Sequence, residues 1–398
     1  QGNGRIPIAA VTGTNGKTTT ARLLATIVQE AGFTTGYTTT DGIYINGELL
    51  NDGDSSGPLS ARLLLKDSSV EFAVLECARG GLLRSGLAFD KCDCAIVTNV
   101  AADHLGMGGI DTVEQLAEVK GVLPKTVVDN GYAILNADDD LVYAMKEKLS
   151  CKVALYSLFP DSVRIEAHCA NGGLVAFVED GYLVLRRGRN LIPIEEVKNV
   201  PITFGGAAKF NIYNVLAACL AAYTSKINLN TIAQTLRTFV PSSETTPGRM
   251  NVFQFKDFTV ISDYAHNPHA LQALGQVVLS FPASVRTGVL AGVGDRRDED
   301  IIEFAEEASR IFDRIIVRQD KDLRGRKAEE INQLVLKGIH NIDPQKPVSF
   351  IHHENEALDH AIQHAISNSL IVFLTDKVEE VSERLNYYLK LDKEKMAM

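Results

Sequence analysis

The stretch that decides the fold lies close to the start of the chain and reads Thr12-Gly13-Thr14-Asn15-Gly16-Lys17-Thr18. An apolar run, Ile6–Val11, precedes it, and Thr18–Ala31 follows with leucine, isoleucine and valine at helical spacing. Strand, glycine-rich loop and helix in this order are typical of a phosphate-binding loop, because glycines let successive backbone N–H groups face phosphate oxygens. Lys17 can reach the β- and γ-phosphates, and the Thr18 hydroxyl can bind Mg²⁺. The stretch therefore predicts a nucleotide site.

The loop departs from the general pattern at one position, because Val11 stands where a first glycine is expected. A glycine turn ahead of a helix also occurs without any bound nucleotide. The preceding strand and the Lys17-Thr18 pair favour the nucleotide interpretation over this plain structural one.

The composition is that of a folded, acidic protein. The chain has 398 residues, of which 45% are hydrophobic and 23% charged, and a formal net charge of -10. A prior of about 100–200 residues per domain predicts two or three domains. The negative charge argues against a general nucleic-acid partner, which would need a basic face. No apolar run reaches about 18 residues, so we expect no membrane span and a cytoplasmic location.

The cysteines carry no metal-binding pattern. No CxxC pair is present, which argues against zinc and for free, buried thiols in a reducing compartment. The six residues are Cys77, Cys92, Cys94, Cys151, Cys169 and Cys219. The first residue is Gln1 rather than Met, so we interpret the chain as either processed or a piece of a longer one.

The first predicted domain, residues 1–242, is a parallel-sheet ATP-binding domain. Phe72–Leu75 and Cys94–Val97 are apolar runs that lead into polar loops, as parallel strands buried on both faces do. Residues 151–204 are predicted to form a β-rich excursion, because short apolar runs alternate there with glycine turns. Its predicted strands are Val153–Tyr156, Val163–Ala167, Leu174–Val178 and Tyr182–Leu185, and an alanine-rich helix follows at Asn211–Thr224.

The second predicted domain, residues 248–398, begins after a turn-rich stretch, Pro241–Gly248. Alternating strands and helices predict a second parallel sheet. The strands are expected at Thr259–Ser262, Val285–Leu290, Arg314–Val317 and Leu370–Leu374, and the helices at about 268–281, 299–312, 326–339 and 355–367. The predicted fold class is α/β, with a P-loop ATPase domain followed by a smaller Rossmann-like domain.

Two polar side chains follow predicted strands of the first domain. Glu76 ends the run Phe72–Leu75, and His104 lies in the loop after Cys94–Val97. Because ligands bind at the carboxyl ends of parallel strands, both residues can hold a hard cation beside the phosphate loop. Each also has a plain interpretation, as a solvated glutamate and as a structural histidine. Lys120, on a predicted helix, is by its position alone a surface lysine.

Further polar motifs lie in the second domain. They are Gly248-Arg249, the run Asp263–Pro268 and the run Gly292–Arg297, and the last two each leave a strand. They predict either a second nucleotide-type site or residues that close over the ATP of the first domain.

Taken in order, these motifs resemble the Mur ligase and folylpolyglutamate synthetase superfamily. The resemblance rests on Thr12–Thr18, Asp103-His104, Asn211-Ile212-Tyr213-Asn214, Gly248-Arg249 and Asp263–Pro268. More narrowly, the chain is similar to the carboxyl-terminal half of the cyanophycin synthetase family, through Gly53–Pro58, Ala78–Arg84, Gly86–Asp90 and Asp320–Arg326. The match covers nearly the whole chain.

The resemblance implies an ATP-dependent amide ligase with ATP and Mg²⁺ as cofactors. In the family, this half joins arginine to the aspartate side-chain carboxyl of a poly-aspartate backbone through an acyl phosphate, and an ATP-grasp half extends the backbone. We therefore expect an acidic peptide and an amino acid as substrates, and an ATP-grasp half in the same or a partner chain. A homo-oligomer is compatible with this expectation.

The resemblance also implies roles for individual residues. Contacts to ATP are expected from Gly13, Thr14, Asn15, Gly16, Lys17, Thr18, Thr19, Asn211, Asn214, Arg249 and Asp263. The implied metal ligands are Thr18, Glu76 and His104, and the implied catalytic residues are Lys17, Lys120, His266 and Arg296. Lys120 matches a position where many Mur ligases carry a carbamylated lysine, and Cys77 stands where the family often has threonine. Substrate contacts are expected from Arg79, Arg84, Asn267, Asp295, Asp320 and Arg324.

Two other hypotheses stay open at this point. One is a stand-alone Mur-like ligase that joins another amino acid to another carboxylate. The other is a non-catalytic scaffold that keeps the fold, which would be expected to lose phosphate or metal positions. Lys17, Thr18 and Glu76 are all retained.

Overall fold

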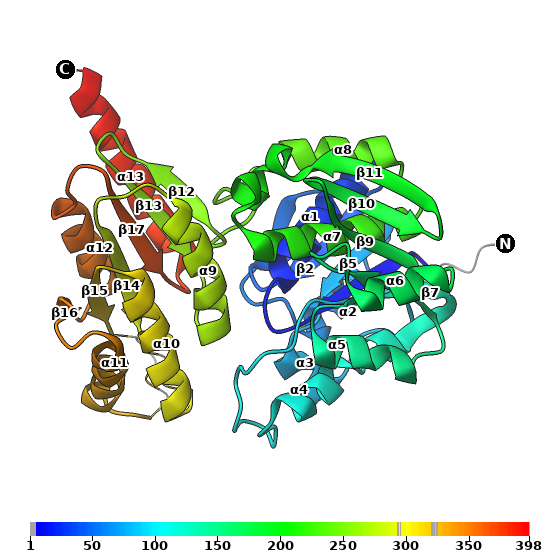
Figure 1. Ribbon diagram of the computed structural model, residues 1–398, viewed down its shortest axis with the longest axis horizontal. Helices are drawn as coiled ribbons and strands as arrows, with labels where there is room; N and C mark the ends of the chain where they lie inside the picture. Colours follow the sequence, from blue (N-terminus) through cyan, green and yellow to red (C-terminus); the bar gives the residue numbers. More distant parts are fainter. Residues whose placement is uncertain (1–4, 293, 295, 320–322, 324, 398) are drawn as a thin grey trace. The chain divides into compact units, whose positions relative to one another are not determined.

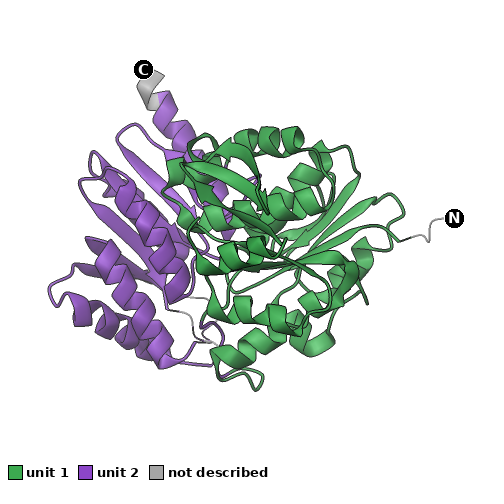
Figure 2. Ribbon diagram, turned by 45° about the vertical axis from the view of Figure 1, so that its right-hand side comes forward, with its two compact units in different colours: residues 1–101, 107–240 green, residues 102–106, 241–398 purple. Residues whose placement is uncertain are grey.

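The computed structural model describes residues 5–292, 294, 296–319, 323 and 325–397. The chain forms two compact units (Figure 2). Unit 1 contains residues 1–101 and 107–240, and unit 2 contains residues 102–106 and 241–398. The short segment 102–106 therefore clusters with unit 2, although it follows a strand of unit 1.

Unit 1 is built on an 11-stranded sheet with the order β11-β10-β9-β8-β7-β6-β1-β5-β2-β3-β4 (Figure 1). Its strands are β1 Ile8–Thr12, β2 Thr35–Thr39, β3 Gly42–Ile45, β4 Glu48–Asp52, β5 Phe72–Glu76, β6 Cys92–Val97, β7 Val127–Asn136, β8 Lys152–Tyr156, β9 Leu174–Glu179, β10 Tyr182–Arg187 and β11 Asn190–Glu196. The seven central strands, in the order β9-β8-β7-β6-β1-β5-β2, pair in parallel. Antiparallel strands extend the sheet at both edges, β10 and β11 beside β9, and β3 and β4 beside β2.

Helices cover both faces of this sheet. They are α1 Lys17–Glu30, α2 Pro58–Leu64, α3 Arg79–Ser85, α4 Val113–Lys120, α5 Asp140–Ala144, α6 Val163–Ala170, α7 Lys209–Thr224 and α8 Leu229–Thr238, with 3-10 turns η1 Pro124–Thr126, η2 Met145–Lys148, η3 Val197–Asn199 and η4 Pro201–Gly206. Successive side chains of a strand point to opposite faces. Ala9 and Val11 of β1 pack in the core with α1 and α7, whereas Ile8 and Ala10 pack in the core with α2. The β1 strand is therefore buried on both faces, as its apolar run predicts.

The segment 151–204 is β-rich, as predicted. The predicted excursion from the main sheet is wrong, because the strands of this segment belong to that sheet. β8 pairs in parallel with β7, β9 pairs in parallel with β8, and β10 and β11 extend the same sheet as hairpins. The predicted strand Val163–Ala167 is wrong, because these residues belong to helix α6. Val163, Ile165 and Ala167 alternate with polar residues, as in a strand, but the buried positions Ile165 and Cys169 lie four residues apart, as in a helix.

Unit 2 contains a six-stranded sheet with the order β12-β13-β17-β14-β15-β16. Its strands are β12 Asn251–Gln254, β13 Phe258–Asp263, β14 Arg286–Ala291, β15 Arg314–Arg318, β16 Val348–Ile351 and β17 Ser369–Leu374, and its helices are α9 Pro268–Ser280, α10 Asp298–Ile311, α11 Ala328–Ile342, α12 Glu354–Gln363 and α13 Val378–Ala397. Only β12 is antiparallel to its neighbour among these described strands. The predicted α/β class is confirmed for both units.

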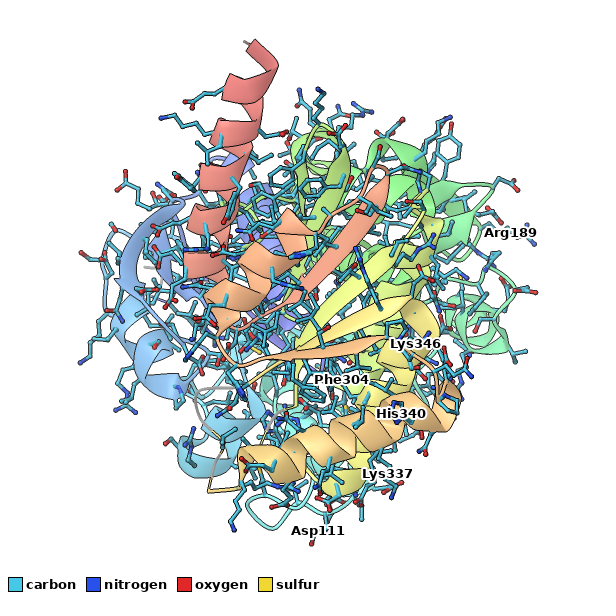
Figure 3. All side chains as sticks on the ribbon, turned by 90° about the vertical axis from the view of Figure 1, so that its left-hand side faces the viewer. Asp111, Arg189, Phe304, Lys337, His340 and Lys346 are labelled. Carbon is cyan, nitrogen blue, oxygen red and sulfur yellow. The ribbon has the colours of Figure 1, made fainter. Side chains whose placement is uncertain are left out.

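Helix α11 illustrates how the helices of unit 2 pack. Lys337 and His340 are exposed, whereas Val335 and Ile339 are buried (Figure 3). At Gly338 an added Cβ would lie 2.4 Å from the carbonyl oxygen of Ile302 in α10. The glycine therefore allows these two helices to approach closely.

The sequence prediction missed several elements. The short strands β2, β3, β4 and β11 and the terminal helix α13 were not predicted, and the helix expected at 355–367 ends at Gln363. A strand that is not buried on one face gives no clear alternation of apolar and polar residues. The edge strand β4 is such a case, because it is exposed along its whole length.

The cysteines and the helices agree with two further predictions. All six cysteines are free, and five are buried, while Cys151 is half-buried. Within the described part of the chain, no helix has both the length and the apolar character needed to cross a membrane. The cytoplasmic location stays a prediction.

Candidate functional site

The glycine-rich loop connects β1 directly to α1. Gly16 caps the helix in the left-handed conformation at φ 85°, and Lys17 begins it with its ammonium donating to the Thr14 carbonyl over 2.9 Å. An added Cβ at Gly13 would lie 1.8 Å from Thr98 Oγ1, and one at Gly16 would lie 2.3 Å from Asn214 Oδ1. Glycine is therefore required at both positions by close neighbours as well as by backbone conformation.

Thr98 and Asn99, which follow β6, are hydrogen-bonded to this loop. Asn99 Oδ1 accepts from the Asn15 amide over 2.9 Å and Asn99 Nδ2 donates to the Asn15 carbonyl over 3.0 Å. The Thr14 amide donates to the Asn99 carbonyl over 2.8 Å, and Thr98 Oγ1 donates to the Asn15 carbonyl over 2.6 Å. Two of the loop amides expected to face phosphate are thus bonded to Asn99. The first-turn amides of α1, which lack intrahelical acceptors, remain the natural phosphate donors.

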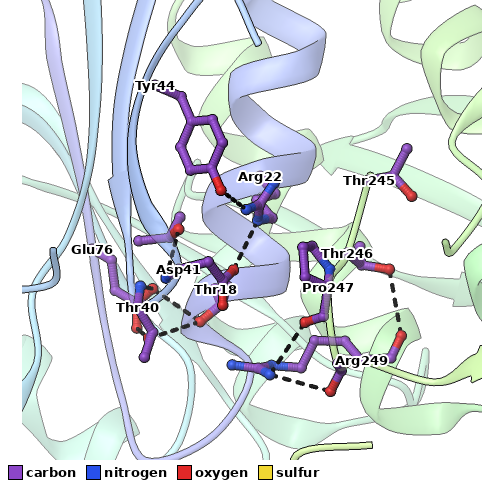
Figure 4. A network of polar contacts seen from close by, with 12 residues as sticks. Thr18, Arg22, Thr40, Asp41, Tyr44, Glu76, Thr245, Thr246, Pro247 and Arg249 are labelled. Atoms are coloured by element: carbon purple, nitrogen blue, oxygen red, sulfur yellow. Dashed lines mark hydrogen bonds and ion pairs between the residues drawn. The ribbon is translucent and has the colours of Figure 1, made fainter. Parts of the chain in front are cut away.

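Glu76, at the end of β5, accepts a hydrogen bond from Thr18 in the first turn of α1 (Figure 4). It is only 2% exposed, so the solvated interpretation is wrong. Its Oε2 accepts from Thr18 Oγ1 over 2.9 Å and from the Thr40 amide over 3.1 Å, and its Oε1 accepts from Thr40 Oγ1 over 3.0 Å. Thr18 Oγ1 and Thr40 Oγ1 lie 3.3 Å apart. A carboxylate and two hydroxyls at this spacing form an oxygen donor set that suits a hard divalent cation.

Lys120 is buried rather than exposed. It is the last residue of α4, its side chain is 3% exposed, and its ammonium donates to the Gly13 carbonyl over 2.7 Å. A capping box between Thr112 and Gln115 starts this short helix. The surface interpretation of Lys120 is therefore wrong, and the lysine contacts the phosphate loop itself.

Asn211 and Asn214 lie on one face of α7 and are both buried. Asn211 Nδ2 donates to the Ile202 carbonyl over 2.8 Å, and Asn214 Nδ2 donates to Asn211 Oδ1 over 3.1 Å. Asn214 Oδ1 accepts from Thr20 of α1 over 3.3 Å. These contacts tie α7 to the helix that follows the loop, and the expected adenine contact stays a prediction. Thr19 of α1 is also buried.

The two arginines proposed for substrate contact lie on α3. Arg79 is half-buried and its Nη2 donates to the Met107 carbonyl, whereas Arg84 is exposed and its Nε donates to the Gly80 carbonyl over 3.1 Å. Cys77 is buried beside Glu76, and burial raises the pKa of its thiol. A small neutral side chain is therefore present where the family often has threonine.

In unit 2, Asp263 ends β13 and organises the loop around it. It accepts from the amides of Met250 and Ala265, both over 2.8 Å, and burial raises the pKa of its carboxyl despite these bonds. The Arg249 guanidinium lies 4.5 Å from the centroid of the Tyr264 ring and donates to the carbonyls of Pro247 and Gly248 (Figure 4). Both residues thus have structural partners within the unit, and their contacts to nucleotide stay predictions.

Asp103, His104, His266 and Arg296 form a polar cluster in unit 2. Potential ligand atoms of the first three lie within 4.8 Å of one another. Arg296 Nη2 lies 3.1 Å from Asp103 Oδ1, and its Nη1 lies 2.7 Å from His104 Nδ1. Because this guanidinium already places a positive charge against two of the three groups, we assign no metal to the cluster. His104 also has a positive φ of 52°, a conformation that few residues other than glycine adopt.

A hollow of about 330 Å³, which includes open solvent, adjoins this cluster. Its polar lining includes Asp103, His266, Asn267 and Arg296, and Phe304 lies on its apolar side. Asn267 also caps α9 by accepting from the Ala270 amide over 2.8 Å. The structure thus brings His266, Asn267 and Arg296 together, and their roles in ligation stay predictions. Asp295, Asp320 and Arg324 lie outside the described residues.

The sequence agrees with this geometry when it is compared with protein-family models. Residues 11–222 match the Mur ligase middle domain, and residues 248–375 match the Mur ligase glutamate ligase domain. The chain belongs to the Mur ligase family. Unit 1 carries most of the middle-domain match, except for residues 102–106, and unit 2 carries the whole of the glutamate ligase match.

Individual relatives sharpen the placement within the Mur ligase family. The chain is 48% identical to cyanophycin synthetase of Crocosphaera subtropica over 96% of its own length and 44% of that protein. It is 31% identical to a UDP-N-acetylmuramoyl-L-alanyl-D-glutamate–2,6-diaminopimelate ligase of Geobacillus thermodenitrificans, over 74% of its length and 58% of that protein. The chain thus spans less than half the length of the cyanophycin synthetases it matches.

Solved structures support the same fold. A bifunctional folylpolyglutamate synthase/dihydrofolate synthase with Mn, AMPPNP and L-glutamate bound superposes with a TM-score of 0.73 at 20% identity, over 96% of this chain and 90% of that one. Identity at this level establishes the shared Mur ligase fold alone.

Three polar residues of the site were not assigned from the sequence. Thr40 contacts Glu76 and Thr18, while Thr98 and Asn99 hold Asn15. The run Thr38-Thr39-Thr40 directly before Asp41-Gly42 was the available signal for the first of them. Thr98 and Asn99 directly follow the run Cys94–Val97, and this strand-end position was the signal for both.

Proposed function

We propose that this chain is an ATP-dependent amide ligase that joins L-arginine to the aspartate side-chain carboxyl of a poly-aspartate backbone. The observation that carries the proposal is the convergence of Thr18, Thr40 and Glu76 at the start of α1, beside a phosphate loop held by Lys120. The high identity to cyanophycin synthetases supports the choice of arginine and an acidic peptide as substrates. ATP and Mg²⁺ are the proposed cofactors.

The first proposed step activates the carboxyl group. A substrate carboxylate oxygen attacks the γ-phosphorus of ATP, the bond to the β–γ bridging oxygen breaks, and ADP leaves an acyl phosphate. Bound at Thr18 and Glu76, the cation would offset repulsion between the two anions. Lys17 would move from the Thr14 carbonyl to the phosphates, where its charge stabilises the developing negative charge.

The second proposed step forms the amide. A neutral amine attacks the acyl carbon, phosphate leaves, and the amine nitrogen loses a proton. We assign His266 and Arg296 to this step, because they adjoin the same hollow and lie among titratable and cationic groups. We assign contact with the acidic peptide to Arg79 and Arg84, whose charges complement carboxylates.

A substrate assay tests this proposal. The folded protein is mixed with ATP, Mg²⁺, poly-aspartate and arginine, and ADP release and arginine incorporation are followed. Lys17→Met is expected to lower the rate on the order of 10²–10³-fold, because one preorganised cationic donor is lost. Absence of ADP release and of arginine incorporation, in a sample supplied with an ATP-grasp half, would contradict the proposal and favour the scaffold.

A second candidate is a stand-alone Mur-like ligase for another amino acid. It is favoured by the similarity to a diaminopimelate ligase over most of this chain. A panel of amino acids separates the two candidates. Incorporation of lysine or ornithine in preference to arginine would select the second one.

We further propose that an ATP-grasp half, in the same or a partner chain, supplies the poly-aspartate. The support is the length of the cyanophycin synthetases, of which this chain matches 44% or less. Co-purification of ligation and backbone-extension activities from the native source would test it.

A further inference from the structure

Arg22 is a buried arginine on α1, one helical turn after Thr18. Its side chain is only 4% exposed, its Nε donates to Asp41 Oδ2 over 3.1 Å, and its Nη2 donates to the Tyr44 hydroxyl over 2.7 Å (Figure 4). Its guanidinium carbon lies 4.6 Å from the centroid of the Tyr44 ring, which stacks on Tyr37 at 4.7 Å. The Arg22 guanidinium is therefore almost fully removed from water, while the Asp41 side chain is 17% exposed.

The Arg22 guanidinium keeps its charge in this setting. Burial by itself lowers the pKa of Arg22, but Asp41 and Tyr44 raise it above its ordinary value. Taking a guanidinium out of water is costly unless it is paired and hydrogen-bonded. Arg22 meets both conditions by holding Asp41 and Tyr44 at the same time.

Asp41 is directly joined to the residue that orients Glu76. Thr40 and Asp41 form the turn between β2 and β3, and the Thr40 amide and hydroxyl donate to the two carboxylate oxygens of Glu76. The Asp41 amide also donates to Thr39 Oγ1 over 3.2 Å. A displacement of Asp41 must therefore move the two donors that set the direction of Glu76.

Helix α1 contacts the Thr40-Asp41 turn through two side chains on one of its faces. Thr18 contacts Glu76 and Thr40 directly, and Arg22 contacts the next residue of the turn. Residues four apart on a helix lie on the same face, so the side chains of Thr18 and Arg22 are neighbours. Gly42 follows the turn, and an added Cβ there would lie 2.6 Å from the Asn51 carbonyl oxygen, so the turn has little room to shift.

We propose that Arg22 is a positioning residue for the cation site, acting through Asp41 and Thr40 on Glu76. This inference rests on the proposed function, because it takes Thr18 and Glu76 as cation ligands. Arg22 touches none of the reacting groups in this role. Its effect is to keep the Glu76 carboxylate and the Thr18 hydroxyl at a spacing that a divalent cation can bridge.

Mn²⁺ affinity tests the proposal without requiring turnover. The full chain is saturated with ADP and titrated with Mn²⁺, and free Mn²⁺ is measured by electron paramagnetic resonance. Arg22→Met and Asp41→Asn are each expected to weaken Mn²⁺ binding roughly 10–100-fold, the range found when groups that orient metal ligands are removed. Arg22→Lys keeps the charge without the forked geometry, so partial recovery is expected. ADP affinity in EDTA should stay unchanged.

Arg186→Met is the matched control. Arg186 is also an arginine of unit 1 with two bonds to one carboxylate, at 2.7 and 3.0 Å from Glu166, but it lies on β10. Loss of this pair should leave Mn²⁺ affinity unchanged. A similar loss in both arginine variants would show a general stability effect and overturn the proposal.

A double-variant comparison separates positioning from packing. In a Thr40→Val background, Arg22→Met should cause no further loss of Mn²⁺ affinity, while its effect on the melting temperature persists. Equal losses in both backgrounds would overturn the proposal, because Arg22 would then act by another route.

Failure of the proposed function gives a different pattern. If Glu76→Gln leaves Mn²⁺ affinity intact, the cation assignment fails and the inference fails with it. If Glu76→Gln abolishes Mn²⁺ binding while Arg22→Met and Asp41→Asn do not weaken it, only the positioning role is overturned.

Discussion

The ammonium of Lys120 donates a hydrogen bond to the carbonyl oxygen of Gly13 over 2.7 Å, and the lysine is 3% exposed. This contact joins the end of α4 to the first glycine of the phosphate loop. It places a positive charge beside the loop where we expect nucleotide phosphates to bind. The hydrogen bond also gives the buried ammonium a polar partner.

We expect Lys120→Met to weaken ADP binding by roughly 10–100-fold, since a hydrogen bond from a charged group contributes about 1.5–3 kcal/mol. Isothermal titration calorimetry measures the change. Lys125→Met is the control, because Lys125 is exposed in the segment that follows α4. Equal affinities for Lys120→Met and the unaltered protein would show that the contact has no role in nucleotide binding.

Gly13→Ala is expected to destabilise the protein by about 1–3 kcal/mol, the usual cost of forcing an atom into a packed site. The new methyl group would lie 1.8 Å from Thr98 Oγ1, so the loop or the Thr98 segment must move. Urea unfolding measures the free energy of unfolding. Gly57→Ala is the matched control, because no atom lies within 4 Å of a Cβ at that position. If the two variants were equally stable, the close approach of Thr98 would be refuted.

Stability should fall as the pH drops below about 6.5, in part because of His168. Burial lowers the pKa of this histidine, and its Nε2 donates to the Val153 carbonyl over 3.0 Å. The unfolded chain therefore binds a proton at a higher pH than the folded chain, so stability is present above the ordinary pKa and is lost as the pH falls through the lowered one. His168→Gln should flatten the dependence of the unfolding free energy on pH between 7.5 and about 5.

His353→Gln provides the comparison for this pH effect, because His353 is exposed. Its pH profile should match that of the unaltered protein. A His168→Gln profile as steep as that of the unaltered protein would rule out the buried histidine as a source of the acid sensitivity.

Cys151 should be the thiol that reacts first with Ellman's reagent in the folded protein. Burial raises the pKa of Cys92 to about 11 and that of Cys219 to about 12. Burial raises the pKa of Cys151 as well, but this thiol is only half-buried and so is open to the reagent. At pH 8 we expect about one fast thiol per native chain, because the thiolate is the reactive form. Cys151→Ser should remove this phase, and denaturant should expose all six thiols of the unaltered protein. A fast phase that survives Cys151→Ser would contradict the burial pattern.

Local patterns were sufficient for much of the fold. The helix predicted over Thr18–Ala31 is α1 Lys17–Glu30, and the strand predicted at Phe72–Leu75 is β5 Phe72–Glu76. The helix has apolar residues at helical spacing, and the strand is an unbroken apolar run that ends at Glu76. Val163–Ala167 predicts a strand by its alternation of apolar and polar residues, and five residues are too few to distinguish this pattern from the first turns of helix α6.

The sequence by itself determined that the chain carries a phosphate loop in an α/β fold, and that Lys17, Thr18 and Glu76 are polar residues at strand or helix ends. These features depend on residues close together in the chain. Only the tertiary structure decided that Thr40 contacts Glu76, that Lys120 is buried against Gly13, and that Arg22 reaches the turn beside Thr40. Each of these contacts joins elements that are distant in sequence, and their partners are set by strand order and helix packing, which no local pattern encodes.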